Sequence, residues 1–114
     1  MKAASVVKSL AALAHEKRLA IFRLLIRPGP KGLPAGSVAS HVGLTPSSLT
    51  FHLQALQRAG LIAPVRAGRQ LIYSAKFSAM SDLVGYLADE CCIENGACRT
   101  ECAPARRAAS RKAA

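Results

Sequence analysis

The chain has little of what large cores and membrane spans require. Its 114 residues include no tryptophan, three phenylalanines and two tyrosines. Aliphatic residues must therefore fill one modest core, and a small chain with so much apolar surface often shares that core with a partner chain. No apolar run approaches the roughly 20 residues that a membrane-spanning helix needs. We expect one small domain, a homodimer and no membrane span.

Acidic residues are also scarce, and their distribution is uneven. The chain has 16 Lys or Arg residues against six Asp or Glu residues, which gives a formal net charge of +10. Residues 1–80 contain Glu16 as their single acid, whereas residues 81–114 hold as many acids as bases. The whole positive excess therefore belongs to the first 80 residues. Such a one-sided field favours nucleic acid as a partner.

Cysteine is absent from the first 90 residues. The opening stretch "MKAASVVKSLAALAH" has an early lysine and an apolar run, as a leader peptide would. Lys8 interrupts that run, however, and Val6, Leu10 and Leu13 have the spacing of an amphipathic helix. We therefore expect a cytoplasmic protein. In that compartment, clustered cysteines bind metals or react more often than they form structural disulfides.

Four helical segments are predicted in the first 60 residues. The first runs from about residue 3 to 14, and the second, "EKRLAIFRLLIR", follows His15 and ends at "PGPKG". In the second, Leu19, Phe22 and Ile26 form an apolar stripe, with Leu25 beside it. "PAGSVASHVG" is a short helix. The fourth segment, "LTPSSLTFHLQALQRAG", has the cap signals of a helix beginning after Thr45 and ending at Gly60.

The pattern then changes to strands and back to a helix. "LIAPVRAGRQLIYSAK" predicts a hairpin, in which Pro64 confines the first strand to a sheet edge. "FSAMSDLVGYLADECC" is helical, and one of its faces is apolar. That face comprises Phe77, Met80, Val84 and Leu87, with Leu83 beside them. Residues 93–114 have no apolar periodicity, so we divide the chain into a domain at 1–92 and a tail at 93–114.

This order of elements predicts a mainly α fold with a β-hairpin wing, the winged helix-turn-helix. On the helix at 46–59, Leu49, Leu53 and Leu56 share the inward face. Outward or flanking residues that could contact DNA are Ser47, Ser48, Thr50, Phe51, Gln54 and Arg58. Phe51 suits apolar contact with a thymine methyl group.

Arg66 and Arg69 flank the hairpin tip and could hold phosphates or enter a minor groove. The three histidines have no metal-ligand spacing to one another or to cysteine. We interpret His52 as a hydrogen-bonding residue at the core edge, His15 as a helix start, and His41 as a residue near a helix end.

Three segments in order, "LAHEKRLAIFRLL", "GLTPSSLTFHLQALQRAGLI" and "RAGRQLIYS", resemble the ArsR/SmtB family of metal-sensing repressors. The resemblance covers about residues 10–90. It implies a homodimer formed through the first and last helices, operator DNA as the partner, and an inducer site. The short third helix has no cysteine pair, and residues 76–92 have no histidine, so two known types of inducer site in the family are absent.

The remaining candidate is "ADECCIENGACRTEC", residues 88–102, which holds all four cysteines. Some arsenic-responsive members of the family are similar, with an adjacent pair and a third cysteine shortly after. We expect Cys91, Cys92 and Cys98 to bind As(III), with Cys102 as an optional ligand. Sulfur-only ligation suits a thiophilic ion, and an adjacent pair is unusual for zinc.

Acids surround these cysteines, which disfavours thiolates and a divalent metal. Neutral As(OH)₃ can instead exchange three waters for three thiols without net proton release. Sb(III), Cd(II), Zn(II) and oxidants remain alternative inducers. A thiol enzyme or metal carrier is less favoured, since no base or nucleotide loop accompanies the cysteines. We expect no enzyme activity and no organic cofactor.

Overall fold

The computed structural model describes residues 2–91 and residue 94. Two helices open the chain, α1 (Ala3–Leu13) and α2 (Glu16–Ile26), and a short 3-10 turn, η1 (Gly29–Lys31), follows them. The later elements are β1 (Leu33–Pro34), α3 (Ala35–Val42), α4 (Pro46–Arg58), β2 (Ile62–Ala67), β3 (Gln70–Ala75) and α5 (Phe77–Ala88). The order of these elements is that of a winged helix-turn-helix, as predicted.

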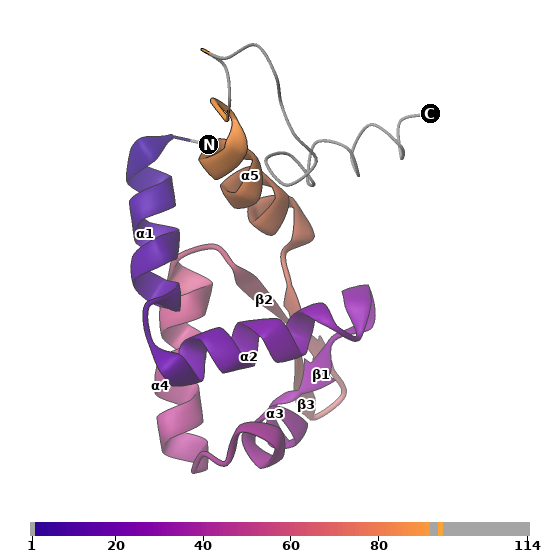
Figure 1. Cartoon of the computed structure of the whole chain (residues 1–114). Coiled ribbons are helices and arrows are strands. Elements are labelled where there is room, and N and C mark those ends of the chain that lie inside the picture. The colour runs from indigo at the N-terminus through magenta and orange to yellow at the C-terminus, as the bar shows by residue number, and fades with distance from the viewer. Residues whose placement is uncertain (1, 92–93, 95–114) are drawn as a thin grey trace.

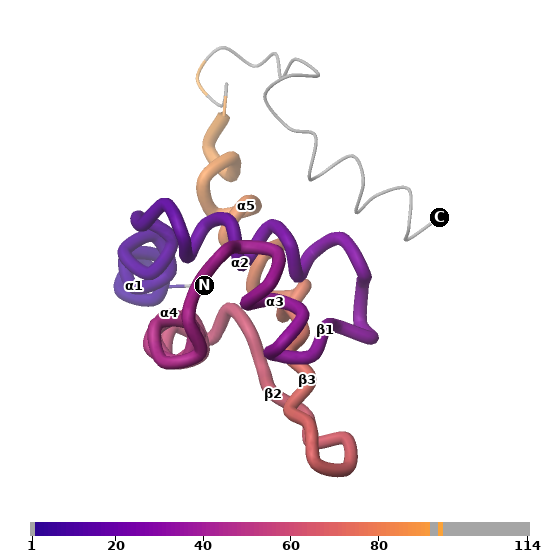
Figure 2. The backbone as a smooth tube through the Cα atoms, turned by 90° about the horizontal axis from the view of Figure 1, so that it is seen from below, coloured from indigo at the N-terminus to yellow at the C-terminus, as the bar shows by residue number. Residues whose placement is uncertain are grey.

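The helices form two groups around α2, which crosses the middle of the molecule (Figure 1). Helix α3 lies below α2 in this view, α4 runs past one end of α2, and α5 lies above α2, next to the N-terminal half of α1. Seen from below, the hairpin of β2 and β3 projects away from the helices as a wing (Figure 2). One core therefore supports both α4 and the wing.

The sheet has three antiparallel strands in the order β1-β3-β2. In the hairpin, the pairing runs from Ile62 opposite Ala75 to Ala67 opposite Gln70. The predicted hairpin and the edge position of Pro64 are both confirmed. The third strand, β1, was not predicted; it pairs Leu33 with Tyr73 and joins the base of the wing to the start of α3.

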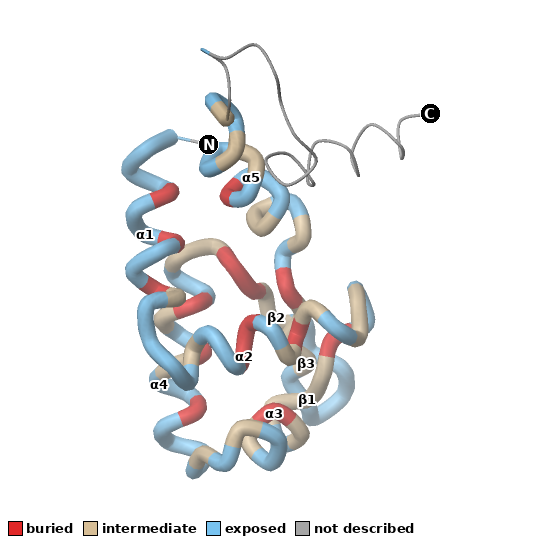
Figure 3. The backbone as a smooth tube through the Cα atoms, viewed as in Figure 1, coloured by how far each residue is buried: buried red, intermediate tan, exposed pale blue. Residues whose placement is uncertain are grey.

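The buried core lies where α2, α4 and the hairpin base meet (Figure 3). Its members are mostly aliphatic: Ala12, Ile21, Phe22, Leu25, Val38, Leu49, Leu53, Leu56, Leu61, Ile62 and Ala75. Ile21, Leu25 and Leu56 are fully buried, which makes them strong contributors to stability through burial of apolar surface.

The predicted apolar stripes of α1 and α2 are wrong in part. Leu10 is 42% exposed and Leu19 is 45% exposed, whereas Ser9 and Ile21 are buried. Apolar residues occur on more than one face of both helices, so their spacing alone does not determine which face meets the core. The exposed apolar residues are therefore available for other contacts.

Helix α5 also differs from its prediction. It ends at Ala88, so Cys91 lies in the turn that follows and does not extend the helix face. The Cys91 N–H donates to the Ala88 carbonyl at 3.0 Å, which continues one turn of hydrogen bonding past the helix end. Apart from Glu94, the predicted tail at 93–114 lies outside the described residues. The domain division at residue 92 therefore remains a prediction.

Candidate nucleic-acid interface and cysteine site

Helix α4 is positioned by strong local signals at both ends. The Thr45 side chain accepts a hydrogen bond from the Ser48 N–H at 3.3 Å, and Pro46 occupies the first turn. Gly60, with φ of 78°, ends the helix in the left-handed conformation that glycine adopts easily. Thr45 and Gly60 therefore act as the sequence predicted.

The inward and outward faces of α4 are as predicted. Leu49, Leu53 and Leu56 are buried. The candidate DNA contacts are exposed on the same helix: Ser47, Ser48, Thr50, Phe51, Gln54 and Arg58. Of these, the Thr50 hydroxyl donates to the Pro46 carbonyl at 2.9 Å and is already engaged with the helix backbone. The outer surface of α4 thus combines small polar groups, an amide and an aromatic ring.

Arg66 and Arg69 are exposed at the end of the wing, on either side of the turn at Gly68. They line a groove together with Pro34 of β1 and Ser37 of α3. The two predicted phosphate contacts of the wing therefore lie beside the start of α3, and they supply the basic side chains of this groove.

All three histidines have the structural roles predicted for them. The His15 side chain caps α2 by accepting a hydrogen bond from the Lys17 N–H at 3.1 Å. His41 lies near the end of α3, and its Nδ1 is 2.8 Å from the Ser37 carbonyl oxygen. His52 is half-buried, and its Nδ1 accepts a hydrogen bond from the Arg18 Nε–H at 3.2 Å. Burial, followed by the charges of His15 and Arg18, lowers the pKa of the His52 imidazole.

Arg18 is a residue that the sequence analysis missed. Its guanidinium carbon lies 5.7 Å from the centroid of the Phe51 ring, so it contacts two consecutive residues of α4. Only its position beside the capping residue His15 could have drawn attention to it. Lys17 makes a second link to the helix-turn-helix, since its Nζ donates to the Val42 carbonyl at 3.1 Å.

Helices α1 and α5 expose an apolar face away from the core. Val7 is 64% exposed and Leu10 is 42% exposed on α1; Val84 is 38% exposed and Leu87 is 62% exposed on α5. Leu83 faces inward and is buried. The two helices lie side by side, so these exposed apolar residues are candidates for contacts between copies.

Of the predicted inducer ligands, Cys91 is described and is half-buried just after α5. Cys92, Cys98 and Cys102 lie outside the described residues. Within residues 2–91 and 94, no group of three His, Cys, Asp or Glu side chains could hold a metal ion. The described part of the chain also contains no helix long and apolar enough to cross a membrane.

Comparison with known proteins identifies the family. A family model described as a helix-turn-helix domain matches residues 13–65. The regulator YgaV of Escherichia coli (strain K12) is 32% identical over 83 residues, which cover 73% of this chain and 82% of YgaV. An ArsR-like transcriptional regulator from Rhodococcus sp. RHA1 has a TM-score of 0.69 and 27% identity, covering 96% of this chain and 91% of that one. The chain belongs to the ArsR/SmtB family of transcriptional regulators.

Two further matches bear on this ArsR/SmtB protein. The regulator NmtR of Mycobacterium tuberculosis (strain ATCC 25618 / H37Rv) is 40% identical over 72 residues, or 63% of this chain. The match spans 58% of NmtR's length, less than two thirds. Mb0332 of Mycobacterium bovis, described as a homodimeric winged helix-turn-helix domain, has a TM-score of 0.62 and 28% identity over 75% of this chain and 80% of that one. NmtR and YgaV are named as transcriptional regulators and not as enzymes, in agreement with the prediction.

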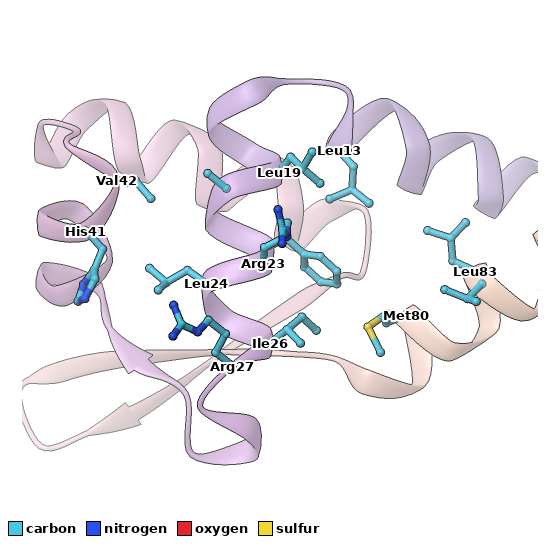
Figure 4. Close-up of a pocket in the computed structure, with 13 residues that line it drawn as sticks. Leu13, Leu19, Arg23, Leu24, Ile26, Arg27, His41, Val42, Met80 and Leu83 are labelled. Carbon is cyan, nitrogen blue, oxygen red and sulfur yellow. The ribbon is translucent and has the colours of Figure 1, made fainter. Parts of the chain in front are cut away.

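The ArsR/SmtB chain also has an apolar cavity of about 790 Å³ beside α2. Figure 4 shows its α2 residues in the middle, with His41 and Val42 of α3 on one side and Met80 and Leu83 of α5 on the other. Met80 and Leu83 of α5 therefore face the same hollow as the side chains of α2.

Proposed function

We propose that this ArsR/SmtB protein binds operator DNA as a homodimer and represses transcription until As(III) binds Cys91, Cys92 and Cys98. The observation that carries the proposal is the position of Cys91, directly after the helix that exposes the apolar face of Val84 and Leu87. An inducer held at this point acts on the end of the helix that joins two copies. The name of the structural relative Mb0332 supports a homodimer.

The DNA-binding half of the proposal rests on α4 and the wing. Ser47, Ser48 and Gln54 can hydrogen-bond base edges, and Phe51 can contact a thymine methyl group in the major groove. Arg58 at the end of α4, with Arg66 and Arg69 on the wing, can hold phosphates. In a symmetric dimer, the two α4 helices would enter half-sites about one helical turn apart.

The end of α5 at Ala88 supports the three-thiol arrangement. On a continuous helix, adjacent cysteines would point about 100° apart, which would keep both from binding one ion. Because α5 ends at Ala88 and a hydrogen-bonded turn carries the chain to Cys91, we expect the chain to leave the helical path after Cys91. Cys98, and Cys102 as the optional fourth ligand, would complete the sulfur-only site.

Release from DNA requires that the inducer bind the free dimer more tightly than the DNA-bound dimer. A hundredfold drop in operator affinity corresponds to a coupling free energy of about 2.8 kcal/mol. The cavity between α2 and α5 is where we expect this change to occur. A movement of α5 there would alter the distance between the two α4 helices without unfolding either domain.

The deciding experiment measures operator binding by fluorescence anisotropy during a titration with arsenite. Cys91→Ser and Cys92→Ser should bind operator with wild-type affinity and should no longer release it, because a three-sulfur site has lost a ligand. Cys102→Ser serves as the matched control and should still respond. A full response by either of the first two variants would show that the site is wrong.

The same assay separates the alternative inducers. We expect release by As(III), and by Sb(III) as its chemical neighbour, with an affinity nearly independent of pH around neutrality. Affinity that rises steeply with pH would instead indicate a divalent ion such as Cd(II) or Zn(II), because that ion must displace thiol protons. Release by peroxide alone would indicate an oxidant-sensing repressor.

A further inference from the structure

Helix α4 is tied to the start of α2 by a cluster of four side chains, which are His15, Arg18, Phe51 and His52. The Arg18 Nε–H donates to His52 Nδ1 at 3.2 Å, and the guanidinium carbon of Arg18 lies 5.7 Å from the centroid of the Phe51 ring. The His52 ring meets the Phe51 ring edge-on, with centroids 5.7 Å apart and planes at 75°. Arg18 thus contacts two residues of α4, Phe51 and His52.

Phe51 is a phenylalanine on the outer face of α4 whose side chain is 63% exposed. An exposed phenylalanine ordinarily samples several rotamers, so placing its ring for DNA contact costs conformational entropy. Here the guanidinium of Arg18 and the edge of His52 contact two sides of the ring. These contacts favour one orientation before DNA arrives, because cation–π and edge-to-face pairs each contribute attraction.

The hydrogen bond from Arg18 determines which form of His52 fits this cluster. His52 Nδ1 accepts from the Arg18 Nε–H, so this nitrogen carries no proton in the arrangement. His15 Nδ1 accepts from the Lys17 N–H, and the His15 and His52 rings lie 4.6 Å apart at 50°.

We propose that Arg18 and His52 are positioning residues for base reading, which hold the Phe51 ring against a thymine methyl group only while His52 Nδ1 is unprotonated. The inference rests on the proposed DNA-binding function and is independent of the cysteine site. A proton on Nδ1 would remove the acceptor for Arg18 and place two cations together. Arg18 would then leave His52, and the Phe51 ring would lose one of its two contacts.

The charged groups around His52 are cations. His15 and Arg18 face it from α2 and lower its pKa after burial, the largest cause. Lys8 of α1 and Arg58 of α4 line one groove together with Arg18. Glu16, which follows His15 in the chain, is exposed. Protonation therefore requires a pH below the usual histidine range of about 6.5.

The test compares three duplexes over pH 8.0 to 5.5. The first is an operator selected from a random library, the second carries deoxyuridine in place of its thymines, and the third has a scrambled sequence. The ratio of operator affinity to deoxyuridine-duplex affinity measures the methyl contact. One buried methyl is worth about 0.8 kcal/mol, so we expect a ratio of about four per half-site at pH 8.0. It should fall toward one at pH 5.5, while affinity for the scrambled duplex does not fall.

Variants separate positioning from a purely structural role. The His52→Asn side chain keeps an acceptor near the place of Nδ1 but does not titrate. The ratio of operator affinity to deoxyuridine-duplex affinity of this variant should therefore be the same at pH 5.5 as at pH 8.0. Arg18→Met should lower the ratio at every pH to the value shown by Phe51→Ala. His41→Asn is the matched control, because His41 is exposed on α3, and it should keep the wild-type pH profile.

Two results would overturn the inference while leaving DNA binding intact. The first is a wild-type ratio of operator affinity to deoxyuridine-duplex affinity that is the same at pH 8.0 and 5.5. The second is an Arg18→Met variant that folds and keeps the full ratio. Wild-type protein that binds the selected and scrambled duplexes equally would overturn the proposed function itself. If Arg18→Met does not fold, the wild-type and His52→Asn pH profiles still decide the question.

Discussion

Gly32 joins the first two helices to the hairpin at a point where no side chain fits. It has φ of 65°, in the left-handed region, and it is buried against the backbone of β3. A Cβ atom at this position would collide with the carbonyl oxygen of Tyr73, the residue that pairs with Leu33. The close approach allows β1 to pair with β3, and it requires glycine for both space and backbone conformation.

We therefore predict that Gly32→Ala strongly destabilises the fold. The positive φ alone costs an alanine about 1 kcal/mol, and the backbone collision should add about 2 kcal/mol. Gly29→Ala is the matched control, because Gly29 has φ of 77° but open space around its Cα. Urea unfolding measures both variants, and equal losses of stability would show that the collision is relieved by a small shift.

The sequence predicted the roles of Thr45 and His15 correctly, because both act on nearby backbone groups. It did not predict the role of Arg18, because Arg18 acts on a residue far away along the chain. Thr45 and His15 lie at helix starts and act on backbone groups two or three residues away. Their roles are therefore encoded within a few positions. Arg18 acts on His52, which is 34 residues away. Only the packing of α2 against α4 brings them together, so sequence spacing did not reveal the contact.

At the scale of the element, α4 was the best predicted because its three buried leucines occupy a single face. The second helix has apolar side chains around much of its circumference, and the expected stripe was right at Phe22 and Leu25 but wrong at Leu19, in whose place Ile21 enters the core. The two-residue strand β1 has no local signature at all. It exists because β3 pairs with it, which is a tertiary cause that a sequence pattern does not show.

The exposed face of α1 and α5 leads to a prediction about assembly. Val84→Asp should convert a dimer to a monomer, because a carboxylate in an apolar interface loses its hydration without gaining a partner. Size-exclusion chromatography with light scattering measures the change. Val65→Asp is the control, since Val65 is exposed to 61% on the wing and should leave the dimer intact. A Val84→Asp protein that stays dimeric would place the interface elsewhere.

At the scale of the whole molecule, the uneven distribution of charge along the chain could be predicted from the sequence alone. The excess of +10 belongs to residues 1–80, which form the helices and the wing. Which of these cations meet the DNA depends on their position in the fold. Arg66 and Arg69 lie at the wing tip, whereas Arg23 and Arg27 line the cavity beside α2. The predicted inducer cysteines, apart from Cys91, lie outside the described residues and remain a prediction.

Salt dependence tests this division of the cations. For each phosphate contact removed, the slope of log affinity against log salt concentration should become shallower by about 0.9. We expect this change for Arg69→Gln in each half-site, with nearly equal loss for specific and scrambled duplexes. Arg27→Gln, on the cavity side of α2, should leave the slope unchanged. If both variants behave alike, the wing does not contact the backbone.

The positions of two prolines have a consequence for solubility. The sheet has two outer strands, and each contains one: Pro34 in β1 and Pro64 in β2. A proline lacks the N–H that an incoming strand would bind, so neither edge is a good template for strand addition. The wing can therefore stay exposed for DNA without offering the edge of its sheet to the wing of another copy.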